Sequence, residues 1–277
     1  MTWNGSVDGY REALKNPDIV SAAQMPVHGA GFAYFNTSKA PFNDPRVMKA
    51  FNLAINRHDM IAVMRGSGSL SRWLPLSASG VTPEATLLTL PYYKVENSDD
   101  IEAAKALMAE AGYPGGEGFP TISYAAEGGN LDEAIIDQLK TNLGVDIEYK
   151  TLERSLVAGE LEGDFDIVRF LVYVSHLRNP APYLRVMHGK GGSQNYGGYD
   201  NPEFDAALDE MDAELDPMKL GAIVQKAQQL LDDNPPGVMP SGFGFHRLIW
   251  RNDVKGMPFG IRKQAIWDRL DTVWLDR

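Results

Sequence analysis

The stretch FNTSKAPFNDPRVMKAFNLAINRHDMI, residues 35–61, decides how this chain folds. It leaves a β-prone segment, residues 32–36, through the polar turn TSKAPFND, and reaches Asp44 followed by Pro45. This pair is a helix-start signal, because proline at the first helical position lacks only an N–H that has no partner there. The apolar residues that follow fall on one face at helical spacing, and they are Val47, Ala50, Phe51 and Ala54. The stretch predicts a strand, a helix, and a second helix from about Arg57.

Strand and helix patterns alternate along the rest of the chain. The segments TISYAAE, VDIEYKTL and FDIVRFLVYV read as strands, and the third is a continuous β-rich run, as expected of a central strand buried on both faces. Asp99 and Glu102 have the spacing of a capping box at the start of a helix. Asn201-Pro202 and Asp216-Pro217 start two more helices, and the apolar stripe of the first is Phe204, Leu208, Met211 and Leu215. This alternation predicts an α/β architecture.

Composition excludes several classes of function. The 277 residues are 44% hydrophobic and 23% charged, and no apolar run approaches the length of a membrane span. The formal net charge of −11 would repel phosphate backbones, so we expect no nucleic-acid partner. Cysteine is absent, which excludes disulfides and thiolate chemistry. The first residues lack the basic and apolar regions of a signal peptide.

Four blocks carry a resemblance to a known family. They are residues 35–61, DIEAAKALMAEAGYPGG, GDFDIVRFLVYV, and the long block that begins NYGGYDNPEFD and ends NPPGVMP. In this order and spacing they resemble the C-terminal portion of the bacterial ABC-transporter extracellular solute-binding proteins of family 5, whose members bind dipeptides and oligopeptides. The resemblance runs from about residue 3 to the C-terminus.

The resemblance implies a fold and a domain arrangement. The expected fold is α/β of the type II periplasmic-binding-protein kind, in which two lobes close on a solute. Residues 33–244 correspond to the second lobe, a mixed sheet flanked by helices, while residues 1–32 and 245–277 correspond to remnants of the first lobe. We therefore expect a truncated product or a fragment, which would also account for the missing signal peptide.

The resemblance also implies a function without a cofactor or a catalytic step. The parent protein would be the substrate-binding component of an ABC importer for peptides, peptide-like compounds or other small polar solutes. Its partners would be that solute and the permease subunits in the membrane, and its location the periplasm or cell envelope. No metal site is expected, because the five histidines show no helix-spaced pair.

Two positions, one within the strand FDIVRFLVYV and one just after it, decide which solute is expected. Arg169 matches the family arginine that helps receive a ligand carboxylate, and the alternative is a pair with a neighbouring Asp or Glu. The family aspartate that holds the amino group of a peptide corresponds to Ser175 or His176, and neither is acidic. Because a buried ammonium needs a partner charge, an ordinary peptide N-terminus is disfavoured.

The other candidate ligand-binding residues each have a plainer alternative. His176 and Arg178 would suit an anionic or polyhydroxylated ligand, or they lie in a solvated loop. Tyr173 and Trp73 would stack on a ligand, or they pack in the core. Asn195 would face the cleft, or it serves the turn chemistry of a Gly-rich loop.

Two rival functions come from other classes. An enzyme, such as a glycoside hydrolase, would use the acidic cluster Glu160, Glu162, Asp164 and Asp166, although a solvated turn is the simpler interpretation. No nucleophile-elbow, zinc-protease or P-loop motif is present. An interaction or dimerisation module would use the exposed surface of the lobe, including Trp250 and Trp267.

Overall fold

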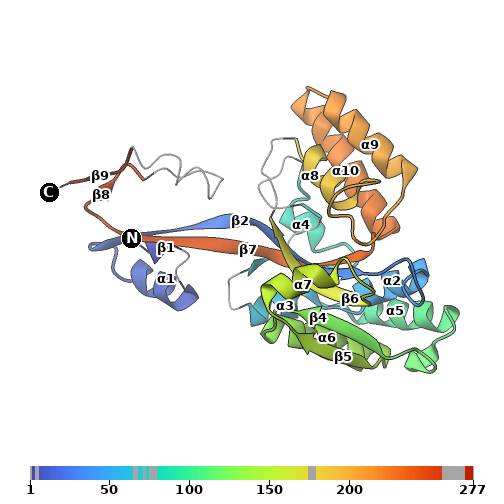
Figure 1. Ribbon diagram of the computed structural model, residues 1–277. Coiled ribbons are helices and arrows are strands. Elements are labelled where there is room, and N and C mark those ends of the chain that lie inside the picture. Colours follow the sequence, from blue (N-terminus) through green and yellow to red (C-terminus); the bar gives the residue numbers. More distant parts are fainter. Residues whose placement is uncertain are drawn as a thin grey trace.

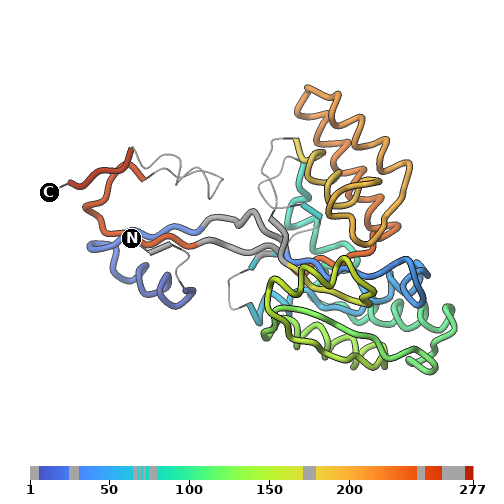
Figure 2. Tube along the Cα trace, in the orientation of Figure 1, coloured from blue at the N-terminus to red at the C-terminus, as the bar shows by residue number. Residues whose placement is uncertain are grey.

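A computed structural model describes residues 2–3, 6–64, 68–70, 73–74, 80–173, 179–257 and 272–276. Within these residues a mixed α/β body carries a long two-stranded ribbon, and β1, α1, β8 and β9 lie at the end of the ribbon away from the body (Figures 1 and 2). The strands are β1 Thr2–Trp3, β2 Val20–Phe35, β3 Gly68–Ser69, β4 Ile122–Ala126, β5 Ile147–Thr151, β6 Ile167–Tyr173, β7 Val238–Arg251, β8 Val254–Lys255 and β9 Trp274–Leu275. The α-helices are α1 Val7–Leu14, α2 Pro45–Leu53, α3 Arg57–Val63, α4 Glu84–Leu87, α5 Ser98–Glu110, α6 Asn130–Leu143, α7 Arg154–Glu160, α8 Ala181–His188, α9 Pro202–Ala213 and α10 Pro217–Asp233.

The main sheet combines parallel and antiparallel pairing. In the described residues its order is β1-β7-β2-β6-β4-β5, with β3 added to β7. β4 runs parallel to both β5 and β6, whereas β2 runs antiparallel to β6 and to β7. β6 therefore lies in the interior of the sheet, as its continuous β-rich sequence predicts, and Ile167 and Val168 are fully buried.

The helix starts follow the capping chemistry of the sequence. The Asp44 side chain accepts a hydrogen bond from the backbone N–H of Arg46 at the start of α2, and Asn201 and Asp216 do the same for α9 and α10. These three predictions are confirmed. Helices α7 and α8 were not predicted. α7 lacks a side-chain cap, whereas Asn179, which precedes Pro180, accepts a hydrogen bond from the Ala181 N–H at the start of α8.

Two details of the sequence prediction are wrong. The capping box of Asp99 and Glu102 does not form, since the N-cap of α5 is Asn97, two residues earlier, and both carboxylates pair with lysines instead. Leu215 does not belong to the apolar stripe of α9. That helix ends at Ala213, and the Leu215 side chain is 93% exposed in the short connection to α10.

Helices cover both faces of the sheet in the body (Figure 1). The face that we name the α6 face presents alternate strand residues such as Ala33, Tyr124 and Ile167 to α2, α3, α5 and α6. The opposite face, the α10 face, presents Phe32 and Val168 to α7, α8, α9 and α10. Each face has its own apolar cluster, so that the sheet is the middle of three layers.

The ribbon consists of β2 and β7, which continue from the body as a single antiparallel pair. Their register runs from Tyr34 opposite Val238 to Val20 opposite Arg251. A small third cluster at the far end contains Leu248, Trp250 and Met257. The lobe boundaries expected at residues 32–33 and 244–245 fall within these two strands, and they stay a prediction.

Candidate functional site

The candidate site lies near the carboxyl ends of the parallel strands β4 and β6. In open α/β sheets ligands bind outside this end of the strands. Arg169 is the third residue of β6, stands opposite Ala33 on β2, and extends from the α6 face. The chain after β4 turns directly into α6, which brings the first turn of that helix beside Arg169.

Arg169 forms a two-pronged ion pair with Asp132 of α6. Its Nε donates to one carboxylate oxygen of Asp132, and its Nη2 donates to the other at 2.9 Å. The Tyr124 hydroxyl donates to the same carboxylate at 3.1 Å. The Asp132 side chain is completely buried and that of Arg169 is 14% exposed. Three donor atoms from two strands thus converge on one carboxylate of α6.

The electrostatics of this network favour the charged pair. Burial acts to lower the pKa of Arg169, but the hydrogen bond and charge of Asp132 outweigh it and raise that pKa above its usual value. Burial raises the pKa of the Tyr124 hydroxyl well above its usual value, and the nearby Asp132 charge adds to this effect. Asp132 also lies in the first turn of α6, where the helix dipole favours a negative charge.

One guanidinium nitrogen of Arg169, Nη1, lies on the side of β2 and β7. A Cβ added at Gly31 of β2 would lie 3.4 Å from Nη1 of Arg169, and it would collide with Oγ of Ser241 on β7. Ser241 is 2% exposed, and its hydroxyl has no hydrogen-bond partner within the described part of the chain. Because Gly31 has no Cβ, a guanidinium nitrogen and a hydroxyl both lie close to it, and these two groups suit a carboxylate or another anion.

The other predicted ligand-binding residues do not gather around Arg169 in the described residues. Trp73 is 3% exposed in the cluster of the α10 face, and its indole N–H donates to Asp232 at 2.7 Å. Asn195 hydrogen-bonds the backbone of Gly189 and Tyr199, as the turn alternative predicts. Ser175, His176, Arg178 and the side chain of Tyr173 lie outside the described residues. Ligand contact by these residues stays a prediction.

Two members of the acidic cluster that suggested a hydrolase, Asp164 and Asp166, make structural contacts. Lys39 lies 2.5 Å from Asp164 and 3.0 Å from Asp166. Burial raises the pKa of Asp166, but hydrogen bonds from Ser123 and Lys39 outweigh burial and lower that pKa overall. A general acid needs the opposite shift. Of the two tryptophans of the interaction alternative, Trp250 is 9% exposed within the third cluster, and Trp267 lies outside the described residues.

Sequence reasoning missed Asp132 and Tyr124. Tyr124 lies in the predicted strand TISYAAE, but nothing in the local pattern indicated that Asp132, an acidic residue of the first turn of α6, is fully buried. Only the register of β4 on β6 brings both side chains to Arg169. Among the described residues no group of three or more His, Asp or Glu side chains is arranged to hold a metal ion. In the same residues no helix has both the length and the apolar character that crossing a bilayer requires.

Comparison with known proteins identifies the family. Residues 2–195 match the family model of the bacterial extracellular solute-binding proteins, family 5 (Middle). The chain therefore belongs to this family.

Similar proteins show how much of the family architecture the chain contains. The chain is 27% identical over 271 residues to the periplasmic murein peptide-binding protein MppA of Escherichia coli K12. This alignment covers 94% of this chain and 48% of MppA. It is 29% identical over 283 residues to heme-binding protein A of Haemophilus influenzae, and this alignment covers 91% of this chain and 48% of that protein. The solved structure of MppA in its unliganded open form superposes with a TM-score of 0.75 at 26% identity, over 97% of this chain and 51% of that one.

These comparisons confirm the predicted fold class. The structural neighbours are type II periplasmic binding proteins, and the mixed sheet flanked by helices follows the same arrangement. The chain spans about half the length of the curated relatives it matches. The relatives named above are binding proteins and not enzymes, as expected from the sequence.

Proposed function

We propose that this chain forms one wall of the solute-binding cleft of an ABC importer, and that Arg169 contacts a carboxylate or similar anionic group of the solute. The observation that supports this proposal is the position of Arg169, on the central strand, near the carboxyl ends of the parallel strands, and fixed by Asp132. The bidentate pair sets the guanidinium plane and leaves Nη1 beside Gly31 and Ser241. A donor that is oriented before the ligand arrives binds at a lower entropic cost.

The proposed solute is a peptide-like compound or another small polar molecule. The relatives MppA and OppA are named for murein peptides and oligopeptides. Ser175 or His176 stands where the family resemblance places an acidic partner for an amino group, so we propose that a free amino terminus contributes little here. Permease subunits in the membrane and a periplasmic or cell-envelope location complete the proposal for the parent protein. Catalysis is not part of it.

Titration of the isotope-labelled chain by NMR tests this proposal. The ligands are trialanine, its C-terminal amide and its N-acetyl derivative. We expect weak saturable binding of trialanine, binding of the amide about tenfold weaker because one charge-assisted contact is lost, and little effect of acetylation. Arg169→Lys keeps a cation for Asp132 but loses the planar fork, so it should remove the preference for the free carboxylate. Equal binding of acid and amide by the unmodified chain would contradict the role of Arg169.

A further inference from the structure

A pocket lies away from Arg169, where the helices of the two faces meet. It has a volume of about 250 Å³ and lies between α2, α5 and α10. The first two helices cover the α6 face of the sheet and α10 covers the other, and the segment of residues 90–92 lines the space between them. None of its lining residues takes part in the Arg169 network.

The walls of this pocket are largely apolar and suit a compact organic group. Leu53 and Leu90 line it together with Pro91 and Ala103. A dry cavity of about 150 Å³ is large enough for benzene, so this pocket has room for a small aromatic or branched aliphatic body. It lies slightly below the size of drug-sized ligand sites, which start at about 300 Å³.

The polar part of the lining is predominantly acidic. Asp100, Asp232 and Asp233 contribute three carboxylates, against one ammonium group from Lys49 in the lining and the ammonium group of Lys94, which pairs with Asp100 from outside it. Asp100 and Asp232 are 5% and 8% exposed, so their charges are poorly screened by water. The net charge of the whole chain, −11, has the same sign. The field at the pocket therefore favours a cation.

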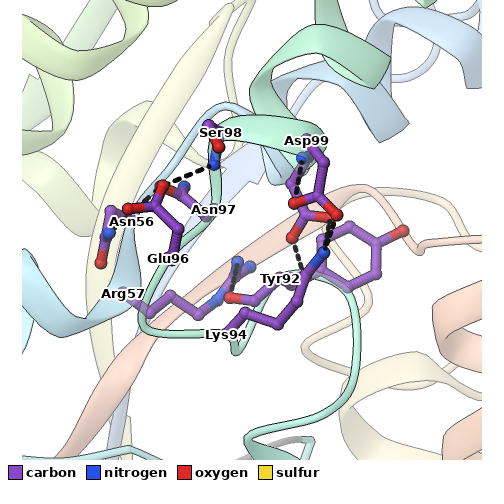
Figure 3. Close-up of polar contacts among 9 residues, drawn as sticks. Asn56, Arg57, Tyr92, Lys94, Glu96, Asn97, Ser98 and Asp99 are labelled. Atoms are coloured by element: carbon purple, nitrogen blue, oxygen red, sulfur yellow. Dashed lines mark hydrogen bonds and ion pairs between the residues drawn. The ribbon is translucent and has the colours of Figure 1, made fainter.

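The backbone of Tyr92, which lines the pocket, is held in an uncommon conformation. Its φ of 71° is in the left-handed region, where a bulky residue is an outlier. The contacts that hold it are drawn in Figure 3: the Tyr92 N–H donates to Asp100 at 2.8 Å, and the Tyr92 carbonyl accepts from Arg57 at 3.1 Å. The Arg57 guanidinium also lies 5.5 Å from the centre of the Tyr92 ring.

Further contacts make this wall rigid. Lys94 pairs with Asp99 at 2.6 Å and with Asp100 at 3.1 Å (Figure 3). The Tyr92 hydroxyl donates to the backbone carbonyl of Asp232 at 3.2 Å, which ties the segment to α10. Strained residues that the surrounding structure over-determines are concentrated at ligand sites, because the strain fixes the shape of the wall.

We propose that this pocket binds a small organic cation, a protonated amine on a compact apolar body. The carboxylates receive the ammonium group, and Leu53, Leu90 and the Tyr92 segment enclose the apolar part. The described residues contain no cluster able to hold a metal ion, and a bare ion would leave the apolar walls unused. The proposal does not depend on the function proposed for Arg169, because the two sites share no residue.

Calorimetric titration of the whole chain with 2-phenylethylammonium tests the proposal, with the uncharged 2-phenylethanol as the comparison ligand. We expect saturable binding of the amine with a dissociation constant of about 1 mM, and binding of the alcohol at least about tenfold weaker. Ala103→Phe should fill the pocket from an exposed position on α5 and weaken amine binding at least about tenfold. Ala109→Phe, on the same helix and exposed but outside the pocket, is the matched control and should bind as the unmodified chain does.

Asp233→Asn adds a test of the charge at a position that tolerates substitution. Asp233 is exposed, so the variant should fold, and loss of its charge should weaken amine binding about threefold without affecting the alcohol. No saturable binding of the amine, or equal binding by the unmodified chain and Ala103→Phe, would overturn the proposal. So would equal affinity for the amine and the alcohol.

Discussion

His188 should make the stability of this protein depend strongly on pH. The side chain lies at the end of α8 in the cluster of the α10 face and is completely buried. Its ring stands edge-on to Phe32 and Trp73, with ring centres 6.0 and 5.6 Å away. Neither ring nitrogen has a hydrogen bond of ordinary geometry within the described part of the chain. Burial lowers the pKa of His188 to about 3, and a backbone contact with Met187 opposes this only in part.

The direction and size of the effect follow from this lowered pKa. Between pH 6.5 and pH 3 the unfolded chain binds a proton at His188 that the folded chain does not, so the free energy of unfolding falls as the pH falls. Each pH unit in that window lowers the free energy of unfolding by about 1.4 kcal/mol. From pH 7.5 to pH 4.5 the contribution of His188 is a loss of about 3 kcal/mol, which is a large part of a typical stability of about 5–15 kcal/mol.

Urea unfolding of the unmodified chain and of His188→Leu, at pH 7.5 and pH 4.5 and equal ionic strength, measures this contribution. Other groups titrate in both proteins. The contribution of His188 is therefore the difference between the two proteins in the unfolding free energy lost from pH 7.5 to pH 4.5, and this difference should be about 3 kcal/mol. At pH 7.5 the two stabilities should agree within about 1 kcal/mol, because the lost ring contacts are offset by removal of two buried nitrogens. Met187→Leu, a conservative change in the same cluster, should keep the original pH dependence. Parallel losses in His188→Leu and the unmodified chain would refute the reasoning.

Three further predictions concern packing and caps, each measured by urea or thermal unfolding. Arg169→Met should lower the free energy of unfolding by about 3–5 kcal/mol, because it leaves the buried Asp132 carboxylate without its cation. The double variant with Asp132→Leu should regain most of this loss. An unchanged free energy of unfolding in Arg169→Met would contradict the ion-pair geometry. Asn201→Ala should cost about 1 kcal/mol through the lost N-cap of α9, and Asn201→Asp should not. Gly197→Ala should destabilise strongly, because the new Cβ would lie 2.5 Å from a backbone carbonyl, while Gly221→Ala, which meets nothing within 4 Å in α10, should gain up to about 1 kcal/mol.

The elements that the sequence predicted best are those fixed by local chemistry. Asp44, Asn201 and Asp216 each cap a helix as expected, because the N-cap hydrogen bond joins residues only two or three positions apart. The end of α9 was predicted two residues too late, since Leu215 continues the apolar spacing but lies beyond the last helical residue. Periodicity alone does not encode where a helix stops.

The candidate site depended on information that the local sequence does not contain. Arg169 was identified through the family resemblance, together with the alternative of an acidic neighbour, but Asp132 lies 37 residues away. Its carboxylate reaches Arg169 only because β4 lies next to β6 and α6 follows β4. The burial of His188 has the same origin, since Phe32 and Trp73 come from distant parts of the chain.

The pairing of β2 with β7 has a consequence for how the protein folds. Ser21 and Asn252, at the far end of that pair, hydrogen-bond at 2.7 Å although they are 231 positions apart. Bringing such distant segments together costs loop-closure entropy before any contact repays it, and folds that are rich in such contacts form slowly. During synthesis β2 emerges long before β7, so the edge of β2 that pairs with β7 stays unpaired, and exposed to non-native strand pairing, until residues 238–251 have been made.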